Sequence, residues 1–179
     1  MIKSFEELEA KQAQCAKSLE GKFKGESGKR SVVLCGGTGC LSSNSAEIQQ
    51  KFVDLINEKG IADRVSVNQV GCFGFCSQGP FVKIYPEDTL YRLVTLDDVD
   101  EIFEKDIKNG EVIERLLYVE PNTGQKVTKQ DDINFYKKQK RVALHGGGVI
   151  NPEDINEAMG YGAFQGLEKA LKMTPQEVI

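Results

Sequence analysis

Two pairs of cysteines are the residues of this sequence best suited to chemistry. Four residues separate Cys35 from Cys40, three separate Cys72 from Cys76, and 31 residues lie between the two pairs. Each pair lies in a glycine-rich loop after a short apolar stretch that predicts a strand. Loops that follow parallel strands emerge at the same edge of a sheet, so the four thiols are expected to converge there on a metal.

The residues around the cysteines favour an iron–sulfur centre. A [2Fe–2S] centre held by thiolates carries negative charge and accepts hydrogen bonds at its sulfurs, and glycines let backbone N–H groups approach it. Apolar neighbours would shield such a centre from water. Tetrahedral zinc also accepts four thiolates and remains the main alternative. The glycines are Gly36, Gly37, Gly39, Gly71 and Gly74, and the apolar neighbours are Leu34, Leu41, Phe73 and Phe75.

Other uses of the cysteines are less favoured. A catalytic Cys-x-x-Cys pair is disfavoured because that spacing is absent. A thiol-based redox sensor, which forms disulfides within the pairs, is a third hypothesis. Four free buried cysteines would not normally arrive in two paired glycine loops. The fifth cysteine, Cys15, lies on the apolar stripe of a predicted helix, where packing is the expected role.

Composition narrows the classes of protein. The chain has 179 residues, 23 basic and 27 acidic side chains, a net charge of −4 and 40% hydrophobic residues. It can therefore form a core, and its acidic balance argues against non-specific nucleic-acid binding. No apolar run is long enough to span a membrane, and the polar N-terminus is unlike a signal peptide. We expect a cytoplasmic protein with reduced thiols.

Alternating apolar patterns predict the elements that position the cysteines. The order is strand, helix, strand, strand, strand, helix, with the first two strands parallel and the last two antiparallel. This predicts an α/β fold, a thioredoxin-like mixed four-stranded sheet with flanking helices. The strands are 31–34, the stretch around Val65 and Val67, 81–85 and 90–94; one helix ends at Gly60, and the other is capped by Thr95 and ends before Gly110.

The flanking segments complete the predicted domain plan. Ser4 and Glu7 form a capping box that opens a helix ending at Gly21. The plan is an N-terminal helix (1–22), a linker (23–30), the thioredoxin-like domain (31–115), a connector (116–141) and a C-terminal helical segment (142–179). The connector carries a turn at 121–124 and a basic run at 137–141. We interpret the run as a solvated connector, with docking to a partner as the second interpretation.

The C-terminal segment is expected to be mainly helical. It begins with a brief strand-like stretch, 142–144, and the turn 146–148. His145 has no expected ligand role. Asn151 and Pro152 predict a helix running toward Met159, and a second helix covers about 163–172. Thr174 opens a third helix, and the chain ends within its first turn, so we expect the native protein to continue.

The cysteine loops also resemble a known family. The segment VVLCGGTGC…GCFGFCSQGPFVKIYP resembles the thioredoxin-like [2Fe–2S] ferredoxin domain in the peripheral arm of respiratory complex I. The tail RVALHGGGVINPEDINEAMGYGAFQGLEKALKMTPQEVI resembles the start of the NADH-binding flavoprotein subunit of complex I. The combination of these two segments in one chain resembles the beta subunit of NAD(P)-reducing and electron-bifurcating [FeFe]-hydrogenases.

This resemblance implies that Cys35, Cys40, Cys72 and Cys76 hold a [2Fe–2S] cluster that transfers one electron at a time. It assigns no catalytic residue. FMN, NAD and a [4Fe–4S] cluster are expected only downstream of Ile179, so the chain alone is not expected to oxidise NADH. The implied partners are other subunits of a redox complex: a flavoprotein, an iron–sulfur hydrogenase subunit and a ferredoxin-like subunit.

Overall fold

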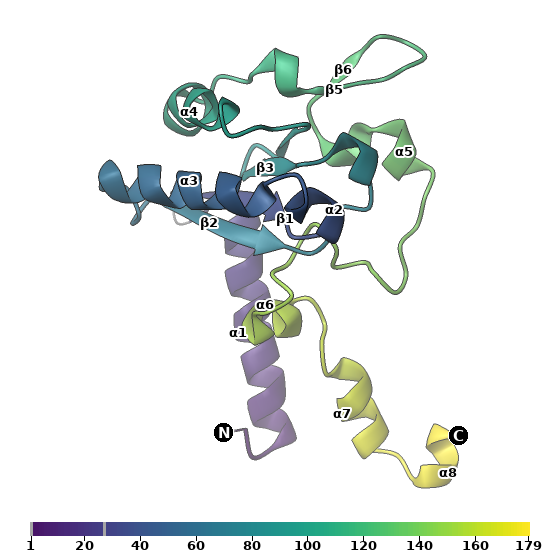
Figure 1. The fold of residues 1–179 in the computed structure, drawn as a ribbon. Helices are drawn as coiled ribbons and strands as arrows, with labels where there is room; N and C mark the ends of the chain where they lie inside the picture. Colours follow the sequence, from purple (N-terminus) through teal and green to yellow (C-terminus); the bar gives the residue numbers. More distant parts are fainter. Residues whose placement is uncertain (1, 27) are drawn as a thin grey trace.

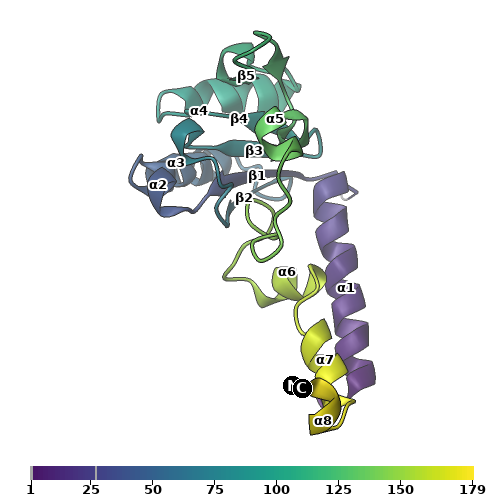
Figure 2. The ribbon, with the colours of Figure 1, turned by 90° about the vertical axis from the view of Figure 1, so that its right-hand side faces the viewer.

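The computed structural model describes residues 2–26 and 28–179. It consists of an α/β body and a long N-terminal helix that projects from it, with the C-terminal helices beside that helix (Figures 1 and 2). Met1, within the predicted helical range 1–22, and Ser27, within the predicted linker 23–30, lie outside the described residues.

A mixed four-stranded sheet forms the centre of the body. Its strands are β1 (Arg30–Cys35), β2 (Val65–Val70), β3 (Val82–Tyr85) and β4 (Thr89–Tyr91), in the order β2-β1-β3-β4. β1 pairs in parallel with β2, whereas β1 with β3 and β3 with β4 are antiparallel. The predicted thioredoxin-like α/β sheet is confirmed. β4 is shorter than the predicted strand 90–94 because Leu93 adopts a positive φ of 50° and Val94 donates to the Pro80 carbonyl.

Helices cover one face of the sheet. α3 (Ser45–Glu58) packs Ile48 and Phe52 against β1, and α4 (Asp98–Glu101) continues as a π-helix over Ile102–Ile107. Thr95 does not cap α4 as predicted. Instead the Asp98 carboxylate accepts hydrogen bonds from the Thr95 N–H and hydroxyl, at 2.7 and 2.8 Å.

α1 (Phe5–Lys24) begins as predicted and ends later. The Ser4 hydroxyl accepts the Glu7 N–H at 3.2 Å, but the Glu7 carboxylate bonds to the Lys3 N–H, not that of Ser4. The helix passes through Gly21 and ends at Gly25, whose φ is 64°. A glycine inside a helix costs only about 1 kcal/mol, and packing of Phe23 on Tyr85, with ring centroids 4.9 Å apart, offsets that cost.

The predicted connector is part of the packed body. It contains a hairpin of β5 (Tyr118–Val119) and β6 (Lys126–Val127), with the predicted turn at its tip, and a short helix α5 (Asn134–Lys137). Tyr118, Val127 and Ile133 are buried together with Cys35 and Cys40 on the face of the sheet opposite α3. These apolar side chains hold the segment against the sheet. Their spacing in the sequence is too irregular to predict a helix or a strand.

The C-terminal segment differs from its prediction at two points. Residues 142–144 form no strand, and Val142 and Leu144 are 77% and 74% exposed. α6 (Ile155–Gly160) starts after Asp154, whose carboxylate accepts the N–H groups of Asn156 and Glu157, while Asn151 accepts the Glu153 N–H in a turn. α7 (Gln165–Leu171) and α8 (Pro175–Val178) follow, and the predicted capping box opens α8.

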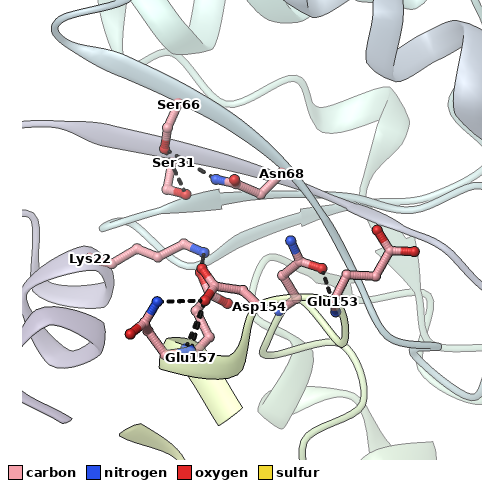
Figure 3. A network of polar contacts seen from close by, with 9 residues as sticks. Lys22, Ser31, Ser66, Asn68, Glu153, Asp154 and Glu157 are labelled. Carbon is pink, nitrogen blue, oxygen red and sulfur yellow. Dashed lines mark hydrogen bonds and ion pairs between the residues drawn. The ribbon is translucent and has the colours of Figure 1, made fainter. Parts of the chain in front are cut away.

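α6 lies against α1 at the base of the body. Lys22 forms an ion pair with Glu157 at 2.6 Å, close to the β1–β2 hydrogen bond between Ser66 and Ser31 (Figure 3). α7 and α8 lie on the same side of the sheet as the projecting part of α1 (Figure 1). The N-terminal and C-terminal segments therefore form one projecting unit.

Candidate metal centre

The sheet brings the two cysteine loops to one edge. Cys35 is the last residue of β1, and it lies opposite Val70, the last residue of the parallel strand β2. The Gly36 N–H donates to the Val70 carbonyl at 2.9 Å, which extends the pairing one residue further. The loops that carry Cys40 and Cys72 therefore leave the sheet side by side.

Short helical turns within these loops orient Cys40 and Cys76. α2 (Thr38–Leu41) carries Cys40, and a 3₁₀ turn over Cys76–Gln78 begins at Cys76. Neither turn was expected from the sequence, where the glycine content indicated open loops. Each turn is held by its own backbone hydrogen bonds, such as Cys40 N–H to Gly37 O at 2.9 Å.

Glycines let each loop pack directly on the cysteines of the other. A Cβ built on Gly37 would stand 3.0 Å from the Cys72 sulfur and 3.4 Å from the Cys35 sulfur. A Cβ on Gly79, in the second loop, would overlap the Cys40 sulfur. The four thiols thus lie in a cradle that larger residues would fill. Gly39 also faces Cys76, but a Cβ built on it would stand 3.6 Å from the Cys76 sulfur, which is an ordinary van der Waals contact.

The two cysteine pairs differ in exposure. Cys35 and Cys40 are 1% and 2% exposed, whereas Cys72 and Cys76 are exposed. Phe73 is fully buried and stacks on Phe81 with ring centroids 5.4 Å apart, so it packs in the core beside the cysteine loops. Leu41 is 39% exposed, so it adds little to the buried side of the site. The site has a dry side and an open side.

Electrostatics already favour a thiolate at the dry side. A hydrogen bond from Cys40 lowers the pKa of Cys35 to about 6, and burial opposes this shift while the N–H groups of Phe73 and Gly37 assist it. The shared proton raises the pKa of Cys40. Burial also raises the pKa of Cys72, which the Gly74 N–H counteracts at 3.2 Å from the sulfur. Metal ligation requires deprotonated thiols, so these donors prepare the site for a metal.

Arg141 ties the end of the connector to the second cysteine loop. Its guanidinium donates to the carbonyls of Cys72 and Gly147, at 3.3 and 3.1 Å, and to that of Phe73. It also lies over the Tyr136 ring, 5.4 Å from the centroid. The interpretation of the basic run 137–141 as a solvated connector is wrong for Arg141, which is bonded to backbone carbonyls. No signal in the run distinguishes Arg141 from its neighbours.

The donor set is compatible with a two-iron cluster. Over residues 2–26 and 28–179, no three His, Cys, Asp or Glu side chains are arranged to hold one metal ion. A [2Fe–2S] centre does not require that arrangement, because each iron takes two cysteines and the sulfides complete its coordination. The glycine cradle and inward N–H groups fit such a centre.

Two other residues considered from sequence lie elsewhere. Cys15 is buried on α1 beside Asn156, 3.7 Å from its side-chain oxygen. The His145 ring stacks on Tyr161, with centroids 5.1 Å apart, and its Nδ1 lies 3.1 Å from the Val142 carbonyl oxygen. The structure brings neither residue to the four thiols.

Comparisons with known proteins identify the family. The model of the thioredoxin-like [2Fe-2S] ferredoxin family matches residues 22–106. A [2Fe-2S] ferredoxin from Clostridium pasteurianum is 51% identical over 77 residues, which are 43% of this chain and 76% of that protein. The chain belongs to the thioredoxin-like [2Fe-2S] ferredoxin family. It therefore contains a [2Fe-2S] electron-transfer domain, and these matches give no support to a zinc scaffold.

Two further relatives of this ferredoxin domain differ in their extent. A [2Fe-2S] ferredoxin from Aquifex aeolicus is 37% identical over 44% of this chain and 71% of its own length; its crystal structure gives a TM-score of 0.46 at 33% identity, over 49% of this chain and 94% of that one. The NADP-reducing hydrogenase subunit HndC of Solidesulfovibrio fructosivorans is 44% identical over 43 residues, 24% of this chain and 9% of that subunit. No helix in the described part of the chain is long and apolar enough to cross a membrane.

Proposed function

We propose that Cys35, Cys40, Cys72 and Cys76 hold the [2Fe–2S] cluster, and that the chain passes single electrons within a multi-subunit NAD(P)-linked hydrogenase. The observation that carries the ligand assignment is the interlocking of the two cysteine loops through glycines. Gly37 faces the Cys72 sulfur and Gly79 faces that of Cys40, so neither pair can be moved without the other.

The chain's residues provide insulation on one side and access on the other. When bound, the cluster supplies a carrier that accepts and releases one electron. The buried pair, Cys35 and Cys40, lies among the apolar side chains that include Phe73 and Phe81, which exclude water. The exposed pair, Cys72 and Cys76, leaves the opposite side open to a partner. Electron exchange is proposed to occur through that open side.

The hydrogenase context rests on the partial match to HndC, which its name describes as a subunit of an NADP-reducing hydrogenase. The proposed partners are a flavoprotein, an iron–sulfur hydrogenase subunit and a ferredoxin-like subunit. FMN, NAD and a [4Fe–4S] cluster are not assigned to any of these residues. The proposed compartment is the cytoplasm, where five unpaired cysteines stay reduced.

Metal analysis and spectroscopy of anaerobically purified protein test the cluster. We expect two irons and two sulfides per chain, a reddish-brown colour, and a rhombic electron paramagnetic resonance signal after reduction with dithionite. Colourless protein with one zinc per chain would overturn the proposal in favour of a scaffold. Disulfides within the pairs and no metal would indicate a thiol sensor.

A pair of serine substitutions tests the ligand set. Cys72→Ser should lose or destabilise the cluster, because a serine oxygen is a poorer ligand for a sulfide-bridged iron site. Cys15→Ser is the matched control and should retain full iron content, since Cys15 packs between α1 and α6. Equal iron loss in the two variants, measured with the visible absorption, would refute the assignment.

A further inference from the structure

One buried polar atom near the cysteines has no partner. The hydroxyl of Tyr136, on α5, is enclosed and makes no hydrogen bond, one of only two such buried side-chain groups in the described ranges 2–26 and 28–179. Burying a hydroxyl without a hydrogen bond costs about 1–3 kcal/mol. A group that is not part of the protein chain is therefore expected to accept a hydrogen bond from this hydroxyl.

The surroundings of Tyr136 place its ring at the cysteine loops. Its ring packs edge-on to Phe75, with centroids 6.0 Å apart, in the second cysteine loop. Arg141 lies over the Tyr136 ring, and its guanidinium donates hydrogen bonds to the carbonyls of Cys72 and Phe73. Tyr136 also packs against the buried group that contains Cys35 and Cys40. Both cysteine loops thus adjoin this one phenol.

We infer that the Tyr136 hydroxyl donates a hydrogen bond to a sulfur of the [2Fe–2S] centre and so raises its reduction potential. The inference rests on the proposed function, because it needs the cluster to be bound by the four cysteines. Tyr136 is a positioning residue that tunes the centre, and no proton is transferred. An added electron increases the negative charge on the sulfurs, so a donor stabilises the reduced form more than the oxidised form.

The phenol is in the correct protonation state for this role. Burial raises the pKa of Tyr136, and the positive charge of Arg141 lowers it only in part. Thiolate charge at Cys35, Cys72 and Cys40 would raise the pKa of Tyr136 further. The hydroxyl therefore keeps its proton at neutral pH and can act only as a donor to an acceptor-rich centre.

Residues outside the part of the chain that matches the ferredoxin family also contribute to the surroundings of the cluster. The family model covers residues 22–106, whereas Tyr136 and Arg141 lie in the segment that was expected to be a connector. This segment would thus set a property of the centre as well as link two parts of the chain. The Tyr136 hydroxyl supplies a side-chain donor, in addition to the backbone N–H donors of the cysteine loops.

The test compares Tyr136→Phe with Tyr118→Phe in the full chain, each loaded with its cluster. Tyr118 is the matched control, because it also packs on Phe75, with centroids 5.6 Å apart, but its hydroxyl is not among the unpartnered groups. Potentials are measured by redox titration with electron paramagnetic resonance. Deuterium electron–nuclear double resonance in D₂O detects an exchangeable proton at the reduced centre.

We expect Tyr136→Phe to lower the ratio of reduced to oxidised centre, at a fixed potential, on the order of tenfold, or about 59 mV for one electron. One exchangeable deuteron should also disappear, and Tyr118→Phe should change neither reading. An unchanged potential with the deuteron retained would overturn the inference. A wild-type protein without a [2Fe–2S] signal would instead refute the proposed function.

Discussion

At the scale of single residues, the second cysteine loop constrains the first through a glycine. Gly79 follows the 3₁₀ turn that begins at Cys76, and its backbone occupies the space beside the Cys40 sulfur. Cys40 is also buried, so its side chain has little free volume into which it can move. The position of one ligand in one loop therefore depends on the absence of a side chain in the other.

Gly79→Ala should weaken cluster retention. The added Cβ would overlap the Cys40 sulfur, and displacing a group that orients a metal ligand typically costs 10–100-fold in affinity. Iron release to a chelator, followed by the loss of visible absorption, should be faster by about tenfold or more. Gly166→Ala, where an added Cβ meets nothing within 4 Å, is the control and should match the wild type.

At the scale of elements, the connector stabilises the cysteine loops that precede it in the chain. Arg141 bonds to two carbonyls of the second loop and to that of Gly147. Cys72 and Cys76, at the two ends of this loop, are both exposed to solvent. Removing the guanidinium should therefore loosen the loop that carries the open pair of ligands.

Arg141→Gln should increase the rate at which the cluster is lost, without preventing its assembly. Each hydrogen bond from a charged donor contributes about 1.5–3 kcal/mol, and the variant loses up to three of them. Hydrogen exchange should also rise in the 71–76 loop. Lys140→Gln removes the same charge from the adjacent, exposed position and should have no effect; equal effects of both variants would argue for net charge alone.

The start of α4 depends on one carboxylate. Burial acts to raise the pKa of Asp98, but hydrogen bonds from Thr95 and the ion pair with Arg115 outweigh it and hold the pKa below its usual range. A carboxylate with a lowered folded-state pKa stabilises the fold above its unfolded-state pKa, about 3.9. That contribution is lost as the pH falls through the lower folded-state value.

Asp98→Asn should therefore destabilise the protein by about 1–3 kcal/mol at pH 7. Thermal unfolding followed by circular dichroism should show the same deficit at pH 6 and pH 8, with the variant and wild type converging only below about pH 4. A deficit that shrinks between pH 8 and pH 6 would contradict the assigned role. Asp97→Asn, at the exposed neighbouring position, serves as the control.

At the scale of the whole molecule, α1 supports the C-terminal segment. α6 approaches α1 so closely that a Cβ on Gly160 would stand 2.7 Å from the Cys15 carbonyl oxygen. Around this contact, Gln12 donates to the Ala163 carbonyl at 2.9 Å, and Lys22 pairs with Glu157 (Figure 3). Lys172, beyond α7, lies over the Phe5 ring at 5.1 Å from the centroid.

Gly160→Ala should separate α6 from α1 while leaving the cluster intact. The obstacle is backbone, which cannot move aside as a flexible side chain can. Limited proteolysis should then cut the 142–179 segment faster, while iron content and the paramagnetic signal stay at wild-type levels. Gly166→Ala again provides the control, and a simultaneous loss of iron would show that the two regions are coupled more tightly than the contacts indicate.

Much of the sheet and the cysteine arrangement could be predicted from sequence, because apolar alternation and paired glycine loops are local signals. The parallel pairing of β1 with β2 followed from the helix between them. Leu41 and Arg141 could not be placed, because exposure and long-range contacts depend on where distant segments fold. Gly21 was assigned as a helix end because local propensity favoured it, whereas the packing of Phe23 on Tyr85 carries the helix further.

The packing of the segment after residue 106 has a consequence for how this protein is divided. Tyr118, Val127 and Ile133 cover the same side of the sheet as Cys35, although the family match stops at residue 106. A fragment that ended at residue 106 would expose the apolar residues on this face of the sheet to solvent. The inherited module and the cooperative folding unit therefore have different lengths, and the later portion completes the earlier one.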